Sequence, residues 1–182
     1  MNFIIYDIEA TCWKTKGEAY QKRQEIIEIG ALKIDDDGQI LSTYSTFVRP
    51  VFHPTLSDFC QQLTSIHQVD VNKAEPFDQI IENFKEWTGM YDEDYLLCSW
   101  GFFDRSIFIK NCLMYDLESE WAKQHISLKH QYPRIIGTGR EVGLKRAVVN
   151  EGFDFDGMHH RAISDAENLA KIFIKYLPLW RF

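Results

Sequence analysis

The first predicted strand of this sequence is apolar on both faces, and this constrains the fold more than any other feature. The segment "NFIIYDIEA" (2–10) is typical of a central strand that other layers cover on both sides. Asp7 and Glu9 interrupt it, and because strand side chains alternate, both point to the same face as Phe3 and Ile5. Two carboxylates so placed repel each other and lose hydration, which is costly unless something compensates. The alternative is that the strand frays near Asp7 and that water solvates both acids.

The remaining pattern predicts an α/β fold. Asp-Gly in the turn "DDDG" (35–38) joins two strand-like runs, so the second and third strands should form an antiparallel hairpin. The predicted strands are 2–10, 25–34, 39–50, 94–100 and a weaker one at 126–130. The predicted helices are 57–66, 75–89, 102–115, 140–152 and 161–177. This order indicates a mixed sheet of about five strands with helices on both faces, in a single domain over residues 1–182.

Composition excludes several classes of protein. A hydrophobic content of 45% excludes a disordered or fibrous chain. The net charge of −7 argues against coating nucleic acid by bulk electrostatics, but not against handling it through metal ions. Four cysteines without metal-ligand spacing argue against a zinc site or a disulfide framework, so a reducing, cytoplasmic location is expected. We expect no leader and no membrane association, because no run approaches the roughly 20 apolar residues of a membrane span.

Three further polar residues stand where sites form. Asp104 opens the helix after "CSWG", just past the end of a strand, where open α/β sheets bind ligands. It could equally be an ordinary first-turn acid that faces the helix dipole. Asp165 lies at the margin of the apolar stripe of the last helix, where a surface acid is not expected. His160 precedes that helix and could lean over a site, or simply face water.

Together these residues suit a metal-dependent hydrolase. Carboxylates favour hard cations such as Mg²⁺ or Mn²⁺ rather than zinc. Two such ions about 3.5–4 Å apart form the clamp used for phosphodiester hydrolysis. A neutral histidine, with a pKa near 6.5, could then take the proton from an attacking water.

Three ordered motifs resemble a known family. "DIEATC" (7–12), "CSWGFFD" (98–104) and "HHRAISDAENLA" (159–170) resemble the exonuclease motifs of the DEDDh 3′–5′ exonucleases, in the RNase H-like superfamily. The segment "FVRPVFHPTLSDFCQQLTSIHQVDV" (47–71) is similar to the middle segment of the ERI-type (enhanced-RNAi) branch. The spacing H-x₄-D of His160 and Asp165 is typical of the histidine subtype.

The resemblance implies a fold, a cofactor and roles for individual residues. It implies an RNase H-like fold in which two Mg²⁺ or Mn²⁺ ions are bound by Asp7, Glu9, Asp104 and Asp165. It also implies that His160 is the general base, that Glu9 shares in catalysis, and that a nucleoside 5′-monophosphate is released. The residues implied to lie near the terminal nucleotide are Ala10 and Thr11 in the first motif, Leu63 and Thr64 in the loop "LTSI", and Phe103. Phe103 could equally belong to the core.

The sequence therefore predicts a metal-dependent 3′–5′ exonuclease that acts on single-stranded 3′ ends. A site that reads one terminal nucleotide needs it unstacked, which favours single strands. RNA is expected over DNA on the resemblance alone, and a DNA-trimming or proofreading enzyme is the nearest alternative. A regulatory binding protein that keeps the exonuclease fold is the alternative from another class. Basic residues in 128–146 could contact backbone phosphates or merely be solvated.

Overall fold

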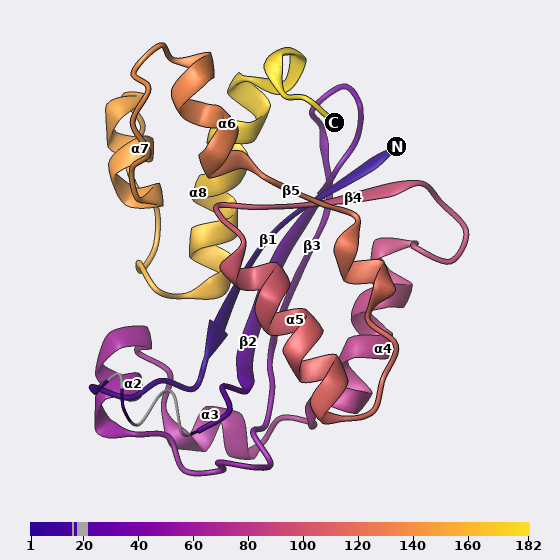
Figure 1. Ribbon diagram of the computed structural model, residues 1–182, viewed down its shortest axis with the longest axis vertical. Coiled ribbons are helices and arrows are strands. Elements are labelled where there is room, and N and C mark those ends of the chain that lie inside the picture. The colour runs from indigo at the N-terminus through magenta and orange to yellow at the C-terminus, as the bar shows by residue number, and fades with distance from the viewer. Residues whose placement is uncertain (16, 18–21) are drawn as a thin grey trace.

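A mixed five-stranded sheet runs through the middle of the computed structural model, which describes residues 1–15, 17 and 22–182 (Figure 1). The strand order is β3-β2-β1-β4-β5, with β1 antiparallel to β2 and parallel to β4. The strands are β1 (Asn2–Ala10), β2 (Ile26–Ile34), β3 (Ile40–Phe47), β4 (Tyr95–Ser99) and β5 (His125–Ser127). The prediction of a mixed sheet of about five strands is confirmed.

Strand β1 is central, and its side chains divide between two cores. Ile4, Tyr6 and Ile8 pack into the core on one face, and Phe3 and Ile5 pack into the core on the other. The strand does not fray at its acids: residue 7 pairs with residue 30 of β2, and residue 9 with residue 28. Both acids are therefore fixed on a regular strand, and the solvated alternative is wrong.

The predicted hairpin is confirmed. Strands β2 and β3 pair antiparallel, and Gly38 in the turn between them adopts a φ of 81°, which favours glycine. The Asp35 carboxylate accepts hydrogen bonds from the backbone N–H groups of Asp37 and Gln39, which closes the turn.

Helices cover both faces of the sheet (Figure 1). In the described ranges the α-helices are α2 (Asp58–Thr64), α3 (Gln68–Asn72), α4 (Phe77–Thr88), α5 (Phe103–Met114), α6 (Leu128–Ile135), α7 (Leu144–Asn150) and α8 (Ala162–Lys175). The short 3₁₀ turns are η1 (Glu120–Lys123) and η2 (Leu177–Leu179). Helices α4 and α5 pack on one face of β1, and α6, α7 and α8 pack on the other.

The structure corrects several predicted boundaries. The predicted strand 126–130 ends at Ser127, and α6 begins at once in a segment read as strand and loop. Pro133 lies inside α6, which hides the helical pattern, because proline removes a backbone donor. The predicted helix 140–152 shortens to Leu144–Asn150. Helix α3 was not predicted, because five residues are too few to show a period.

Among the described residues, no helix combines the length and the apolar character that crossing a bilayer requires.

Candidate active site

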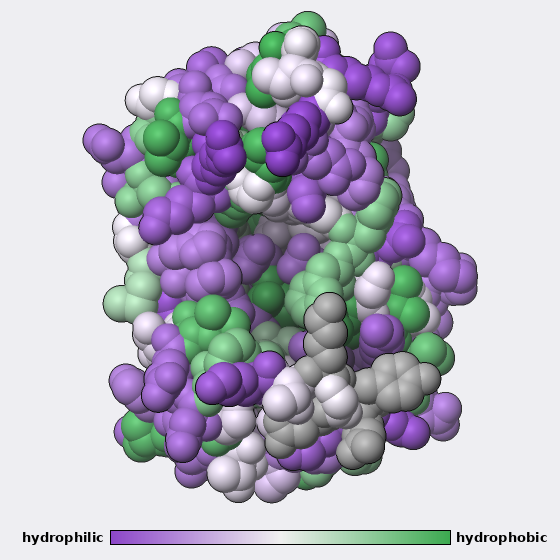
Figure 2. Space-filling model, turned by 60° about the vertical axis from the view of Figure 1, so that its left-hand side comes forward, coloured by the Kyte–Doolittle hydropathy of each residue, from purple (hydrophilic) through white to green (hydrophobic). Residues whose placement is uncertain are grey.

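A pocket of about 500 Å³ opens where β1 and β4 end. The side chains that line it come from β1, from the segment after β4 with the start of α5, and from α6. Others come from the start of α7 and the segment before it, and from the loop before α8 with that helix's first turn. All five residues to which the sequence assigned chemistry line this one pocket, namely Asp7, Glu9, Asp104, His160 and Asp165. Figure 2 shows that the face bearing α7 and α8 is hollowed near its middle.

Three of the carboxylates lie within reach of one ion. One oxygen from each of Asp7, Glu9 and Asp165 lies within 4.8 Å of the others. Alternation along β1 puts the first two on the face that α8 covers, and the first turn of α8 supplies the third. Asp104, at the start of α5, is buried and lines the same pocket.

An ion pair between β2 and α8 fixes the start of α8. The buried carboxylate of Glu28 accepts hydrogen bonds from Arg161 Nη2 at 2.8 Å and from the backbone N–H of Ala162 at 2.8 Å. A carboxylate at a helix N-terminus satisfies a free donor and complements the helix dipole. Sequence reasoning missed Glu28, although it interrupts an apolar run just as Asp7 does.

Gly30 lets α8 approach the sheet. It pairs with Asp7 across β1 and β2, so it faces α8 beside the acid pair. A Cβ at this position would stand 2.2 Å from the backbone nitrogen of Ile163 and 2.3 Å from the backbone carbon of Ala162. Only glycine permits this approach, which brings Asp165 to β1.

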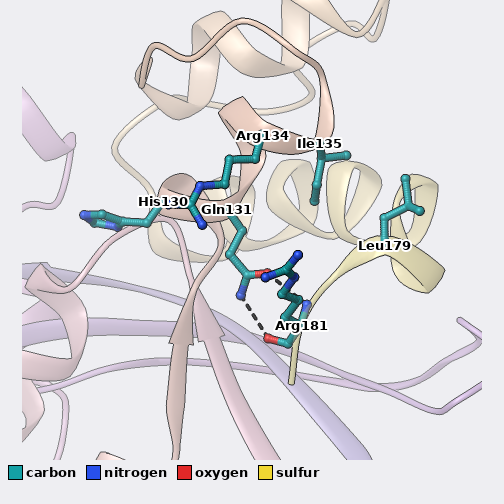
Figure 3. Close-up of a pocket in the computed structure, with 6 residues that line it drawn as sticks. All are labelled: His130, Gln131, Arg134, Ile135, Leu179 and Arg181. Atoms are coloured by element: carbon teal, nitrogen blue, oxygen red, sulfur yellow. Dashed lines mark hydrogen bonds between the residues drawn. The ribbon is translucent and has the colours of Figure 1, made fainter.

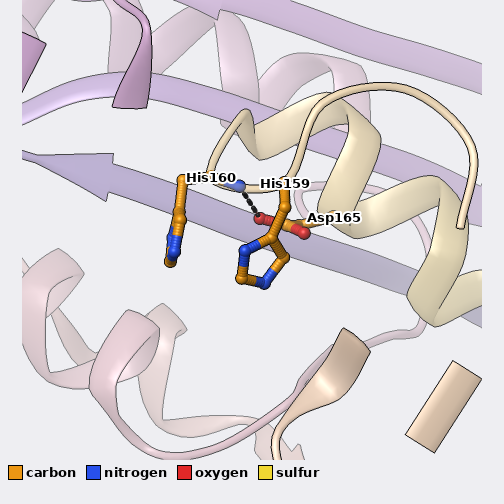
Figure 4. A group of neighbouring side chains, drawn as sticks. All are labelled: His159, His160 and Asp165. Carbon is orange, nitrogen blue, oxygen red and sulfur yellow. Dashed lines mark hydrogen bonds between the residues drawn. The ribbon is translucent and has the colours of Figure 1, made fainter. Parts of the chain in front are cut away.

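His160 is held by its backbone as well as by its place in the loop. Its φ is 67°, in the left-handed region, and its N–H donates to Asp165 Oδ2 at 2.9 Å. Figure 4 shows the imidazoles of His159 and His160 projecting from the loop beside the Asp165 carboxylate, and their ring centroids are 3.9 Å apart. Desolvation, followed by the positive charge of Lys145, lowers the pKa of His160. It is therefore neutral at pH 7 and can accept a proton.

The acids of the pocket resist ionisation. Desolvation is the main cause and repulsion from the neighbouring carboxylates adds to it, so the pKa of Glu9 rises to about 9 and that of Asp7 rises well above its usual value. Desolvation also raises the pKa values of Asp104 and Asp165 to about 6 each, against hydrogen bonds from Ser99 and from the His160 backbone. The pocket thus concentrates more negative charge than the protein alone stabilises.

A divalent cation fits this set of donors. Among the residues that the structure describes, the buried Oδ1 of Asp165 has no hydrogen-bond partner, while Oδ2 accepts from the His160 backbone N–H. A buried carboxylate oxygen without a partner is costly, and a cation in the pocket would supply the missing interaction. Carboxylate oxygens are the ligands that hard divalent ions prefer.

The charge of the pocket leads to a prediction about stability. The raised pKa values mean that the folded state favours the protonated acids. Without divalent ions, the free energy of unfolding should therefore be greatest below the pKa values of the acids in the unfolded chain. It should fall as the pH rises through their pKa values in the folded protein. We expect the Tm in EDTA to fall by roughly 5–10 °C between about pH 5 and pH 8.

Divalent ions should reverse this fall. Protons compete with the ion for the carboxylates, so Mg²⁺ or Mn²⁺ should raise the Tm more at about pH 8 than at about pH 5. Differential scanning fluorimetry measures both series. An equal effect of the ion at both pH values would contradict the assignment of these acids as its ligands.

Four of the five residues that were predicted to contact the nucleotide do not line the pocket that holds the predicted metal ligands and His160. Ala10 and Thr11 are buried and do not line the pocket, and the Thr11 hydroxyl accepts from the backbone N–H of Glu25. Leu63 and Thr64 lie in α2 rather than in a loop, which corrects the sequence interpretation. Leu63 is 38% exposed, but Thr64 is fully buried and its hydroxyl donates to the Cys60 carbonyl. The side chain of Thr64 therefore stabilises α2.

Aromatic side chains border the pocket. Phe103 lines it and is 52% exposed, so the alternative that it belongs to the core is wrong. Phe102 also lines the pocket, and its ring lies 4.6 Å from that of His130. Sequence reasoning missed Phe102 and His130, although Phe102 stands inside the second motif and His130 inside the basic segment.

Comparisons with known proteins agree with this site. The model of the exonuclease family, RNase_T, matches residues 4–173. The chain is 29% identical to ERI1 exoribonuclease 2 of Xenopus laevis, over 93% of this chain and 27% of that protein. It is 32% identical to human ERI1 exoribonuclease 3, over 93% of this chain and 52% of that protein. The chain therefore spans about a quarter of the length of the first relative and about half of the length of the second.

A solved structure shares the fold. The nuclease domain of 3′hExo, described as a DEDDh family member and solved with rAMP bound, superposes with a TM-score of 0.87 and 28% identity. The match covers 97% of this chain and 92% of that one. The RNase H-like exonuclease fold predicted from the sequence is confirmed.

The chain belongs to the exonuclease (RNase_T) family. Its resemblance to the DEDDh exonucleases and to their ERI-type branch is confirmed, and membership implies dependence on a divalent metal.

Proposed function

We propose that this protein is a metal-dependent 3′–5′ exonuclease that removes nucleoside 5′-monophosphates from single-stranded 3′ ends, of RNA rather than DNA. The observation that carries the proposal is the convergence of four carboxyl groups and a neutral histidine in one pocket. Two relatives are named as exoribonucleases, and a similar nuclease domain was solved with a ribonucleotide bound, which supports RNA.

The side chains of the pocket divide the work. Asp7, Glu9, Asp104 and Asp165 would hold two Mg²⁺ or Mn²⁺ ions, and these ions would supply the charge stabilisation that phosphodiester hydrolysis requires. His160 takes the proton from the attacking water, and its lowered pKa keeps it able to do so at neutral pH. The hydrogen bond from the His160 backbone N–H to Asp165 holds the base at a fixed position beside the carboxylates.

The rim of the pocket suits a terminal nucleotide. Phe102 and Phe103 are exposed at the start of α5 and offer aromatic faces to a base. Stacking on aromatic side chains contributes about 1–3 kcal/mol per base without sequence preference, and it requires an unpaired base. Single-stranded ends therefore fit best. A cytoplasmic location is part of the proposal and is supported by four cysteines that are all free.

The proposal is tested on matched single-stranded RNA and DNA oligomers of one sequence, in Mg²⁺ and in EDTA. We expect nucleoside 5′-monophosphates to appear in Mg²⁺, faster from RNA, and none in EDTA. Labelling either end establishes direction, and a circular oligomer, which has no end, should stay intact. Release in EDTA, or cleavage of the circle, would contradict the mechanism. Faster release from DNA would favour a DNA-trimming enzyme, and tight protein binding without hydrolysis would favour a regulatory role.

A further inference from the structure

A second pocket adjoins the catalytic one. It has a volume of about 340 Å³ and lies between α6 and the segment that follows α8. His130, in the first turn of α6, lines both pockets, so the two pockets are adjacent. Figure 3 shows His130, Gln131 and Arg134 projecting from α6, and Leu179 and Arg181 on the segment that follows α8.

Two guanidinium groups of this pocket lack an acidic partner. Within the described part of the chain, the side chains of Arg134 and Arg181 form no ion pair and no hydrogen bond. The wall shared with the catalytic pocket differs, because Glu141 lies 3.8 Å from Lys129 Nζ and 3.6 Å from His130 Nε2. The positive charge of Arg134 and Arg181 is therefore available to a ligand in the second pocket. In the catalytic pocket, by contrast, Glu141 already pairs with Lys129.

The segment that carries Arg181 is held in place. Gln131 of α6 donates to the Arg181 carbonyl at 3.0 Å and accepts from its N–H at 2.8 Å. The preceding residue, Trp180, is buried and donates from its indole to the Phe173 carbonyl at 2.9 Å. The backbone of Arg181 is thus ordered against α6, at a fixed place relative to Arg134.

We propose that the pocket formed by His130, Arg134 and Arg181 binds backbone phosphates of the single strand on the 5′ side of the nucleotide being removed. The proposal rests on the proposed function, since the strand must enter the catalytic pocket by its 3′ end. The net charge of −7 is a further argument for a local cationic site, because a protein that repels phosphate overall needs local cations to retain a strand. Guanidinium groups suit this task, since they present planar donors to phosphate oxygens.

The test removes both charges. Arg134→Gln/Arg181→Gln should weaken binding of a fluorescein-labelled oligouridylate, measured in EDTA, by about 5–20-fold. The slope of log affinity against log salt should fall by about 1.4, because each single-strand phosphate contact contributes about 0.7. In Mg²⁺ the KM for a long oligomer should rise more than kcat falls. This KM effect should shrink for a dinucleotide without a 5′ phosphate, because its single phosphodiester is the one being cleaved and it has no further phosphate for the second pocket.

Matched variants separate charge from folding. Lys73→Gln/Lys110→Gln removes two exposed cations away from both pockets and should leave affinity, salt slope and KM unchanged. Arg134→Lys/Arg181→Lys keeps the charge and should retain most of the binding. The Tm of each variant verifies its fold.

The outcomes distinguish the two proposals. If the wild type releases nucleotides but the double glutamine variant keeps the wild-type affinity, salt slope and KM, the second pocket does not bind the strand and the exonuclease proposal stands. An equal KM increase on the dinucleotide would also overturn the role of the second pocket. If the wild type releases no nucleotide from any oligomer, the proposed function fails and the inference fails with it.

Discussion

Replacement of His160 by alanine should lower kcat by about 10²–10⁴-fold, the usual contribution of a general base. The imidazole is neutral at pH 7 because desolvation and Lys145 lower its pKa, and it lines the pocket that holds the four acids. Its side chain has no other structural role that the described contacts reveal beyond packing on His159. Metal binding, measured as the Mg²⁺-dependent rise in Tm, should therefore survive. Steady-state release of nucleotide from a single-stranded RNA oligomer measures the loss.

Two comparison variants make this result specific. The φ of His160 is 67°, a conformation that asparagine tolerates better than alanine does, so His160→Asn removes the base with less backbone strain. It should lose as much activity as His160→Ala. His159→Ala should lose less than tenfold, although its ring lies beside that of His160. A greater loss in His159→Ala would transfer the role of base to His159, and full activity in His160→Asn would show that the alanine variant failed through its backbone.

The central strand and its acids could be predicted from the sequence because both obey local rules. Alternation placed Asp7 and Glu9 on one face, and a two-sided apolar pattern placed their strand at the centre of the sheet. Their places at the ends of predicted elements singled out Asp104, His160 and Asp165, the ordered motifs implied roles for them, and the structure brings all five side chains to one pocket. Their catalytic and metal-binding roles stay predictions.

The contacts that hold this pocket together could not be predicted, because they join residues far apart in the chain. Glu28 and Arg161 are separated by more than a hundred positions, and no local pattern signals that their side chains meet. The second pocket could not be predicted for another reason. Pro133 interrupts the helical pattern of α6, so no helix was predicted in the basic segment and Arg134 could not be placed on one. The burial of Thr64 likewise depends on how α2 packs, which its sequence does not state.

A deleterious effect of Gly30→Ala is the second large expectation, and it tests how the pocket is assembled. The added Cβ would lie 2.2 Å and 2.4 Å from the backbone nitrogen and Cα of Ile163, and 2.3 Å from the backbone carbon of Ala162. Backbone atoms in the first turn of a helix cannot rotate away as a side chain can, so α8 must shift relative to β2. The ion pair of Glu28 with Arg161 opposes that shift. Overpacking of this kind costs about 1–3 kcal/mol, so the Tm should fall by several degrees.

The larger effect of Gly30→Ala should be on activity. Asp165 accepts a hydrogen bond from the His160 backbone, and both residues should move with the start of α8. Asp7 stays on β1. A misplacement of about 1 Å costs about 10²-fold in rate, so we expect kcat to fall at least that far and the Mg²⁺-dependent rise in Tm to shrink. Gly143→Ala is the matched control, because no atom of the described residues lies within 4 Å of the Cβ that alanine would add there, and the φ of Gly143 is −68°. It should lose less than about 1 kcal/mol of stability and keep its activity. If Gly30→Ala behaves like this control in both kcat and Tm, then close contact between β2 and α8 does not position the metal-binding acids.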